Sequence, residues 1–326
     1  MSQQRIWTRL FLILLLALTA AVLPGQQGPG PAEDQGFKIG VEVNMVTVPV
    51  TVRKQEGGFF KGLEKDAFRV YEDGEPQEIV FFAQEGLPAR IAIVLDSSGS
   101  VRTEWGTIKY ATKRFIENLK PEDEFALISF DSEIRLKMDW GRRTERVDPV
   151  LTSIYCKGAT KLWDAIWLVS TDLFKGIREK KAIIIMSDGL DTNSAVSYKE
   201  ALDAAVRSEA AMYVVSKTEA IKQLAIKEYE DVPHEVFVNA DLALRKLSFE
   251  TGGRVLYPNT FGQLGDIYAQ VDEELRNQYT IGYVSSNPNK DGTYREIRVR
   301  VNAPGATVSA RPGYYAPDEL SRYIVP

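Results

Sequence analysis

The stretch IAIVLDSSGS, residues 91–100, sets an apolar run directly before a short polar segment. Apolar residues of this kind predict a buried strand, and ligands of parallel sheets bind beyond the carboxyl ends of such strands. Asp96, Ser98 and Ser100 are spaced by two residues, so a tight loop can direct all three side chains to one centre. The stretch therefore predicts a sheet that carries an oxygen-rich site at one edge.

Strands and helices alternate around this stretch. Short apolar runs rich in β-forming residues predict strands at 91–95, 125–130, 182–186, 212–215 and 254–257. Apolar residues at helical spacing predict helices at 104–119, 144–154, 161–174, 197–210, 240–250 and 261–277. This alternation is typical of βαβ units, so we expect an α/β fold with a doubly wound, mostly parallel sheet and helices on both faces.

The segment before this region is rich in β-strand patterns. Apolar residues alternate with period two over 38–85, and strands at 68–71 and 79–82 are expected to be joined through an Asp73-Gly74 hairpin turn. Pro49 cannot donate a ladder hydrogen bond, so it favours an edge position.

From Gln278 the chain returns to strands, at 279–284, 295–301 and 307–310. Neither flank is large enough for a good core of its own. We therefore expect residues 38–87 and 278–316 to pair into one small β-sandwich, into which a domain of residues 88–277 is inserted.

The first 25 residues predict a secretory signal peptide. Arg5 and Arg9 precede an apolar run over residues 10–23, which suits the roughly 7–15 residues of a signal-peptide apolar region better than the roughly 20 of a spanning helix. An uncleaved membrane anchor is the alternative. Residues 26–37 are rich in glycine and proline and predict a disordered leader. We expect an exported protein that is periplasmic, cell-surface or secreted.

Composition excludes several classes of function. The formal net charge is −5 and there is no long basic run, which argues against a nucleic-acid partner. The single histidine, His234, excludes a His-paired metal centre and makes a Ser-His-Asp triad very improbable. The single cysteine, Cys156, excludes an intrachain disulfide and a Cys-rich zinc site. No small-molecule substrate is evident.

Two further segments add oxygen donors to the candidate site. Thr160 lies in the loop that opens the predicted helix 161–174, and Asp188 follows the predicted strand 182–186. With the three residues of the first loop, they make two carboxylates and three hydroxyls, a donor set that suits Mg²⁺ (or Mn²⁺ or Ca²⁺) and not zinc. Two carboxylates neutralise the ion, but hydroxyls are weak donors, so a free coordination position should attract a carboxylate from outside.

This constellation resembles the metal-ion-dependent adhesion site of von Willebrand factor type A domains. The shared pattern is D-x-S-x-S after the first strand, a threonine at the start of a later helix and Asp-Gly after a central strand, and the resemblance covers about residues 88–277. It implies that Ser98, Ser100 and Thr160 contact the metal directly. It also implies that Asp96 and Asp188 bind directly or through water, and that a Glu or Asp of a protein partner fills the remaining position.

The flanks carry a weaker resemblance. Residues 48–52, 68–74, 278–283 and 311–314 resemble segments that bracket the von Willebrand factor type A-related domain of exported bacterial proteins. This match extends the resemblance to about residues 38–316.

Two residues near the site are candidates for contact with a partner. Trp105 could rim the metal face or pack in the core, and Asp191 could help at the site or be a solvated loop acid. The polar segment 217–238 is longer than an ordinary connection and is expected to be a surface insertion.

These observations favour a non-enzymatic, exported adhesion module that binds an acidic side chain through a metal. One alternative is a scaffold or assembly subunit that binds through its β flank and keeps a structural metal site. The other is a metal-dependent hydrolase, which needs a base or nucleophile beside the metal. Its candidates, Asp131, Asp191 and Glu104, carry no distinguishing signal.

Overall fold

The computed structural model describes residues 45–84, 87–143, 146–177, 179–216 and 234–318, all within one compact unit of the chain. The predicted signal peptide and leader lie outside these residues, as do residues 217–233 of the expected insertion. The last residues assigned to that insertion, 234–238, instead begin helix α6. Within the described ranges, no helix has both the length and the apolar character needed to span a membrane.

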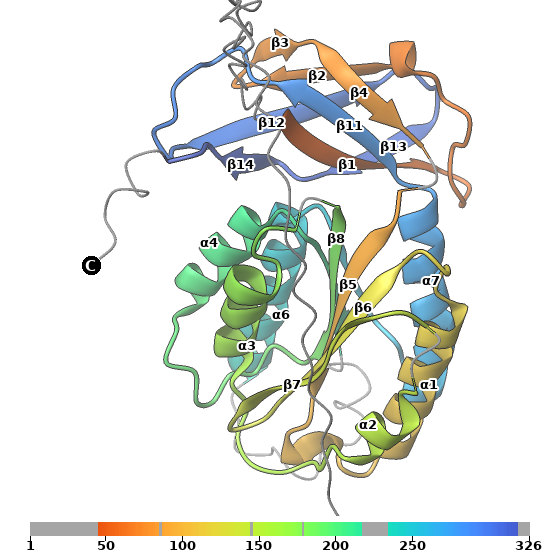
Figure 1. Cartoon of the computed structure of the whole chain (residues 1–326), viewed down its shortest axis with the longest axis vertical. Coiled ribbons are helices and arrows are strands. Elements are labelled where there is room, and N and C mark those ends of the chain that lie inside the picture. Colours follow the sequence, from red (N-terminus) through yellow and green to blue (C-terminus); the bar gives the residue numbers. More distant parts are fainter. Residues whose placement is uncertain (1–44, 85–86, 144–145, 178, 217–233, 319–326) are drawn as a thin grey trace, which may run out of the picture. The chain divides into compact units, whose positions relative to one another are not determined.

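A six-stranded sheet, in the order β10-β9-β8-β5-β6-β7, forms the centre of the α/β region (Figure 1). Its strands are β5 (Ala89–Asp96), β6 (Glu124–Phe130), β7 (Ile134–Gly141), β8 (Lys180–Ser187), β9 (Ala211–Ser216) and β10 (Arg254–Leu256). All neighbours pair in parallel except β6 and β7. The predicted mostly parallel sheet is confirmed. The edge strand β7 was not predicted, because its residues are only partly buried and give no apolar run.

Helices cover both faces of this sheet (Figure 1). On one face lie α1 (Trp105–Asn118), α2 (Asp148–Thr152) and α7 (Leu264–Arg276); on the other lie α3 (Leu162–Leu168), α4 (Tyr198–Ser208) and α6 (His234–Glu250). Successive side chains of a strand point to opposite faces. Accordingly Ile91, Ile93 and Leu95 pack in the core on the α1 face, whereas Ala92 and Val94 pack in the opposite core. This double burial explains why the strand is apolar throughout.

Both flanks form antiparallel sheets of four strands, in the orders β13-β1-β11-β4 and β14-β12-β2-β3. The strands are β1 (Met45–Lys54), β2 (Phe68–Glu72), β3 (Glu75–Gln77), β4 (Ile79–Ala83), β11 (Tyr279–Val284), β12 (Tyr294–Val301), β13 (Ala306–Ala310) and β14 (Gly313–Tyr315). Alternate residues of β1, such as Val48 and Val50, share one core with Phe68 and Ile297 of the other sheet. The predicted pairing of the two flanks into a small sandwich is confirmed.

Two details of the flanks differ from the prediction. The Asp73-Gly74 turn joins β2 to β3, after which the chain crosses to the other sheet, where β4 pairs with β11. Both turn residues have positive φ, 49° and 89°, as a two-residue type I′ turn requires. Pro49 lies on β1, which is not an edge strand. However, β13 pairs with β1 only from Val50 onward, so at Pro49 the strand β1 pairs with β11 alone.

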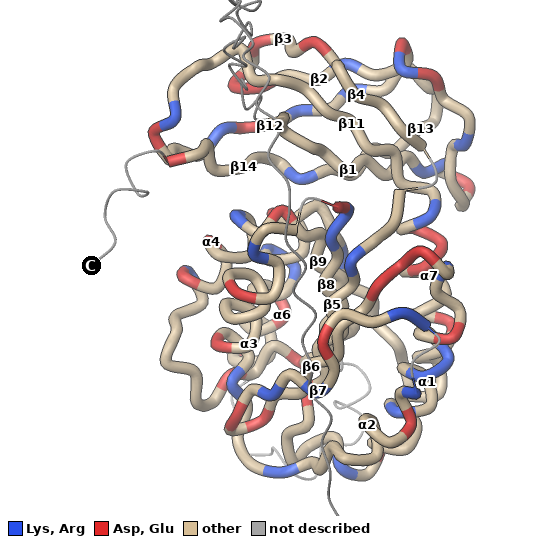
Figure 2. The backbone as a smooth tube through the Cα atoms, in the orientation of Figure 1, with Lys and Arg blue, Asp and Glu red and all other residues tan. Residues whose placement is uncertain are grey.

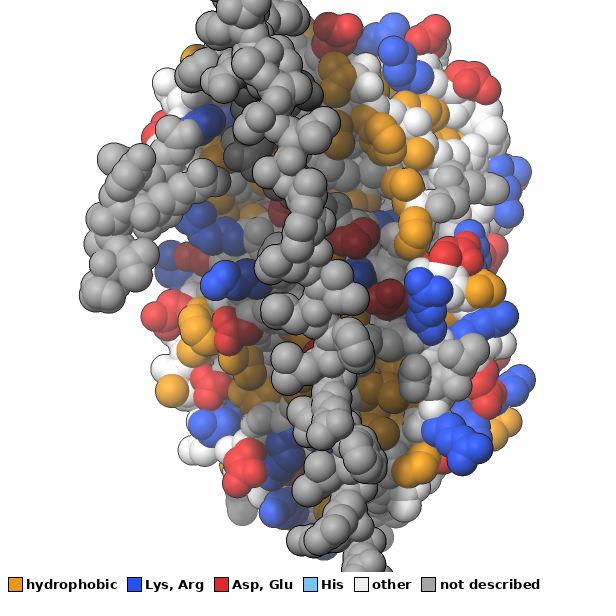
Figure 3. All heavy atoms as spheres, in the orientation of Figure 1, with side chains coloured by type: hydrophobic (Ala, Val, Ile, Leu, Met, Phe, Trp, Pro, Cys, Tyr) orange, Lys and Arg blue, Asp and Glu red, His pale blue; other side chains and the backbone are white. Residues whose placement is uncertain are grey.

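The described surface is mixed in charge. Figure 2 shows Lys and Arg interspersed with Asp and Glu along the described chain. On the face drawn in Figure 3, hydrophobic side chains lie in small groups between charged ones.

Candidate functional site

Parallel pairing brings two carboxylates to the same edge of the central sheet. Leu95 of β5 pairs with Met186 of β8, so Asp96 and Asp188 leave adjacent strands that lie about 4.8 Å apart. Both are buried, with 0% and 7% of the residue exposed. Each is oriented by its own turn: the Ser98 N–H donates to Asp96 Oδ1 at 2.8 Å, and the Leu190 N–H donates to Asp188 Oδ1 at 3.1 Å.

The loop after β5 places two hydroxyls side by side. Ser98 Oγ and Ser100 Oγ lie 3.1 Å apart, as expected from their spacing. Ser98 is the N-cap residue of a 3₁₀ turn, Gly99–Val101, which contains Ser100. Ser97 points elsewhere, because its hydroxyl donates to the carbonyl oxygen of Phe130 at 3.0 Å. Side chains of this loop therefore alternate in direction: Ser98 and Ser100 face the candidate site, whereas Ser97 holds the loop against β6.

Backbone hydrogen bonds tie the Thr160 loop to the loops that follow β5 and β8. The Lys157 N–H donates to the Ser97 carbonyl at 2.9 Å. The N–H groups of Thr192 and Asn193 donate to the Thr160 carbonyl at 3.0 and 3.1 Å. Thr160 itself is 9% exposed. The structure thus joins all three loops that the sequence singled out.

Asp191, in the loop after β8, hydrogen-bonds to the start of α3, the helix that follows the Thr160 loop. Its Oδ1 accepts the Leu162 N–H at 2.8 Å and the Ser194 hydroxyl at 2.6 Å, and its Oδ2 accepts the Ser194 N–H at 3.1 Å. It therefore caps the amino end of α3, whose own N-cap position is Lys161, a residue that makes no side-chain cap. A helix that begins without a capping residue of its own was the available signal for this role.

We predict that Asp191→Ala lowers the free energy of unfolding by about 1–2 kcal/mol, because it removes a helix cap and leaves partly buried N–H groups without this acceptor. Urea unfolding followed by circular dichroism measures the change. Glu122→Ala, at an exposed acid without such contacts in the described structure, is the control and should change stability by less than about 0.5 kcal/mol. Equal effects of the two substitutions would contradict the capping role.

The sequence left the roles of two other residues near the site open. Trp105 is 8% exposed and packs in the core on the α1 face, so it offers little surface to a partner. Asp131 comes directly after β6, next to the end of β5 at Asp96, and is fully buried. Its Oδ1 accepts the Glu133 N–H and its Oδ2 pairs with Arg135, both at 2.9 Å, which makes it a weak candidate for the base of a hydrolase.

The donor set suits a hard divalent cation. Two buried carboxylates would balance the charge of the ion, and three hydroxyls would add neutral oxygens, with water completing an octahedral shell. Within the described part of the chain, no group of three or more His, Cys, Asp or Glu residues could hold a metal. A metal at this edge would therefore depend on the serine and threonine hydroxyls.

Comparison with known proteins bears on the same segments. A family model described as von Willebrand factor type A domain matches residues 91–190, from β5 to the turn after Asp188. No curated protein matches the chain.

Several solved structures are similar to the chain at low identity. The pilus adhesin SpaC from Lactobacillus rhamnosus GG, in an open conformation, is 12% identical over 82% of this chain and 48% of its own, with a TM-score of 0.48. A von Willebrand factor type A protein from Catenulispora acidiphila is 13% identical over 79% of this chain and 76% of its own, with a TM-score of 0.47. Proximal thread matrix protein 1 from the mussel byssus is 14% identical over 63% of this chain and 51% of its own, with a TM-score of 0.45. This chain thus spans about half the length of the adhesin and of the byssus protein.

Proposed function

We propose that the protein is an exported, non-enzymatic binding module in which a divalent cation links the sheet edge to an acidic side chain of a protein partner. The match of residues 91–190 to the von Willebrand factor type A domain model supports this proposal. One observation carries this proposal: buried Asp96 and Asp188 leave adjacent parallel strands, beside the paired hydroxyls of Ser98 and Ser100. Thr160, on the loop tied to both strands, is the fifth proposed ligand.

The proposed ligands are of two kinds, charged carboxylates and neutral hydroxyls. Asp96 and Asp188 would balance the double charge of Mg²⁺, or of Mn²⁺ or Ca²⁺ in its place. Ser98, Ser100 and Thr160 would add oxygens without further negative charge. When bound, the cation would offer an electron-poor coordination position that favours a carboxylate from outside. Asp191 would keep the Thr160 loop in place through α3 and would not contact the partner directly.

Domain boundaries and location belong to the same proposal. We assign residues 1–25 to a signal peptide, 26–37 to a leader, and 38–87 with 278–316 to the β-rich domain. Residues 88–277 form the von Willebrand factor type A-like domain, and β5 beginning at Ala89 and α7 ending at Arg276 support these limits. The signal peptide predicted from the sequence supports export to the periplasm, the cell surface or the medium.

The test is capture of a partner from an envelope extract by the immobilised protein, in Mg²⁺ and in EDTA. We expect at least one protein to be retained in Mg²⁺, to be lost in EDTA, and to be lost in Mg²⁺ when the bait is Asp188→Asn. Retention of the same proteins by Asp188→Asn would favour the scaffold instead. EDTA-sensitive turnover in a phosphatase and esterase screen would favour the hydrolase.

A further inference from the structure

A cavity of about 600 Å³ lies between the end of α3 and the last turns of α4. Helix α3 continues there as a π-helical turn, Val169–Leu173, and short π-helical segments are frequent at functional sites. The volume falls within the range of about 300–1,000 Å³ that is typical of small-molecule sites. Lys181, at the start of β8, also lines the cavity, so it lies at the other end of β8 from Asp188 and is separate from the proposed metal site.

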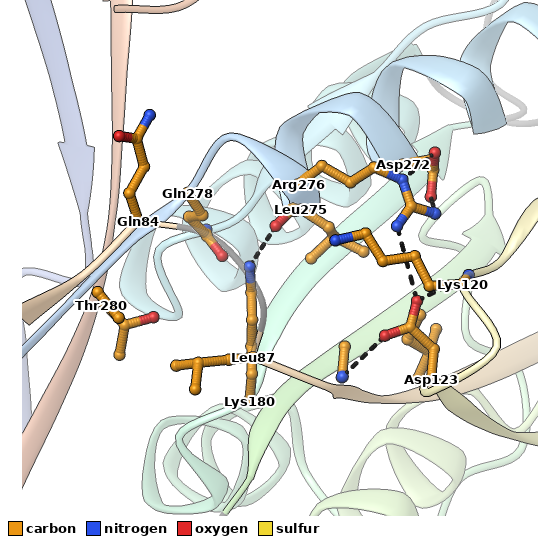
Figure 4. Close-up of a pocket in the computed structure, with 13 residues that line it drawn as sticks. Gln84, Leu87, Lys120, Asp123, Lys180, Asp272, Leu275, Arg276, Gln278 and Thr280 are labelled. Atoms are coloured by element: carbon orange, nitrogen blue, oxygen red, sulfur yellow. Dashed lines mark hydrogen bonds and ion pairs between the residues drawn. The ribbon is translucent and has the colours of Figure 1, made fainter. Parts of the chain in front are cut away.

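The cavity around Lys180, the preceding residue of β8, is a contrast (Figure 4). Its volume is only about 20 Å³, which is room for about one water molecule. Its charged groups are also held by the protein: Lys180 Nζ donates to the Leu275 carbonyl oxygen, and Asp123 Oδ1 accepts the Ala89 N–H at 2.9 Å. The larger cavity is therefore the better candidate for a ligand.

The wall of the larger cavity contains an exposed indole. Trp167 lines the cavity and is 38% exposed, although tryptophan is a highly buried residue on average. Phe174 and Ala204, which are both buried, add to the apolar part of the wall. The cavity can therefore hold a ligand with a flat apolar face against the indole ring.

A buried hydroxyl without a partner also lines the cavity. Ser170 lies in the π-helical turn and is 5% exposed. Its Oγ is buried and has no hydrogen-bond partner among the described residues. A buried polar group without a partner costs free energy, and a hydroxyl of a ligand would supply the missing partner.

Helix α4 adds a hydrogen-bond donor and an acceptor to the wall. The guanidinium of Arg207 lies 3.9 Å from the ring centroid of Tyr315, which fixes its position. Asp203, one turn earlier, accepts hydrogen bonds from the Lys199 ammonium and the Tyr315 hydroxyl, both at 2.8 Å. Cationic and anionic side chains line the cavity together, so it offers donors and acceptors and not a single sign of charge.

We propose that this cavity binds one pyranose unit of a neutral saccharide with equatorial hydroxyls, such as a β-glucosyl unit. The axial C–H groups of such a ring form a flat apolar face, which would stack on Trp167. Its hydroxyls each donate and accept, so they would pair with Ser170, Asp203 and Arg207. A purely apolar ligand would leave the Ser170 hydroxyl unpaired, and a small anion would leave the indole without a contact.

The experiment is calorimetric titration of the whole protein with cellobiose at pH 7, in EDTA so that the metal site makes no contribution. Sorbitol supplies hydroxyls without a ring, and cyclohexanol supplies a ring with a single hydroxyl. We expect cellobiose to bind with one-to-one stoichiometry and at least tenfold more tightly than either control compound.

Aromatic variants test the stacking contact. Trp167→Ala should weaken cellobiose binding at least tenfold, whereas Trp167→Phe, which keeps an aromatic ring, should stay within about threefold of the wild type. Tyr155→Ala, at an aromatic residue that is 76% exposed and does not line the cavity, should leave binding unchanged. Circular dichroism establishes that each variant is folded.

Ser170→Ala separates a ligand contact from a structural role. It should weaken cellobiose binding about fivefold, the worth of one hydrogen bond. The free energy of unfolding should stay the same or rise, because the substitution removes an unpaired hydroxyl and introduces a better helix former. Lower stability with unchanged binding would overturn the assignment of Ser170. The whole proposal is overturned if cellobiose binds no more tightly than sorbitol or cyclohexanol, or if folded Trp167→Ala binds it like the wild type.

Discussion

Asp96→Asn is expected to weaken the binding of Mg²⁺ about 100-fold or more, to the point where titration calorimetry of the metal-free protein detects no heat. The substitution removes one of the two negative charges that would balance the cation. The remaining ligands would be one carboxylate and neutral hydroxyls, which hold Mg²⁺ poorly. Loss of even an outer-shell partner commonly costs 10–100-fold in metal affinity, so loss of a charged ligand should cost at least the upper end of that range.

Asparagine keeps the local structure intact for this comparison. Its amide oxygen can still accept the Ser98 N–H that Asp96 Oδ1 accepts at 2.8 Å, so the loop after β5 keeps its turn. Asp131→Asn is the matched control, because Asp131 is equally buried and follows the neighbouring strand β6, but is paired with Arg135 and lies outside the proposed ligand set. It should leave the affinity within about threefold of the wild type. Equal loss in both variants would show that the ligands are wrongly assigned, and no binding by the wild type would refute the site.

The residues at the edge of the sheet could be predicted from sequence because each strand carries the same local pattern, an apolar run that ends in a polar residue. A strand buried on both faces is apolar at every position, and the polar residue that ends it marks the sheet edge, as Asp96 does after residues 91–95. Parallel strands end at one edge, so Asp188 had to lie near Asp96 once both strands were assigned to one sheet. The same reasoning applies to Asp131, whose strand was also predicted.

The pairing of the two distant flanks could be predicted, but individual contacts between distant segments could not. Asp191 caps a helix that begins 29 residues earlier in the chain, and no local pattern specifies that contact. The Asp73-Gly74 pair indicates a tight turn but not which sheet the chain joins after β3. For Trp105 the sequence left the metal face and the core open; in the structure it lies with Ile108 and Ala111 on the buried face of α1.

Glu72→Ala is expected to lower the free energy of unfolding by about 3–5 kcal/mol, the largest stability effect that we predict. Glu72 is 2% exposed; its Oε2 accepts the hydroxyls of Tyr283 at 2.8 Å and Tyr314 at 3.0 Å, and its Oε1 pairs with Arg295 at 3.2 Å. Arg295 is also 2% exposed. Removal of the carboxylate would leave a buried guanidinium without its counter-charge and two buried hydroxyls without their acceptor, which is the costly way to break a buried pair.

Guanidinium chloride unfolding, followed by far-ultraviolet circular dichroism and by tryptophan fluorescence, measures this loss. The control is Glu296→Ala, which breaks the ion pair with Arg298 at 3.0 Å, where both side chains are more than 60% exposed; it should change stability by less than about 0.5 kcal/mol. Four of the five tryptophans, Trp105, Trp140, Trp163 and Trp167, lie in the α/β region, and the fifth, Trp7, lies in the predicted signal peptide. In protein prepared without residues 1–25, fluorescence therefore reports the α/β region, whereas circular dichroism reports every sheet. If the β-rich domain unfolds independently, Glu72→Ala should shift a circular dichroism transition that fluorescence does not follow. Coincident shifts in both signals would instead show that the two regions unfold as one cooperative unit, and an unchanged midpoint would contradict the importance of the buried pair.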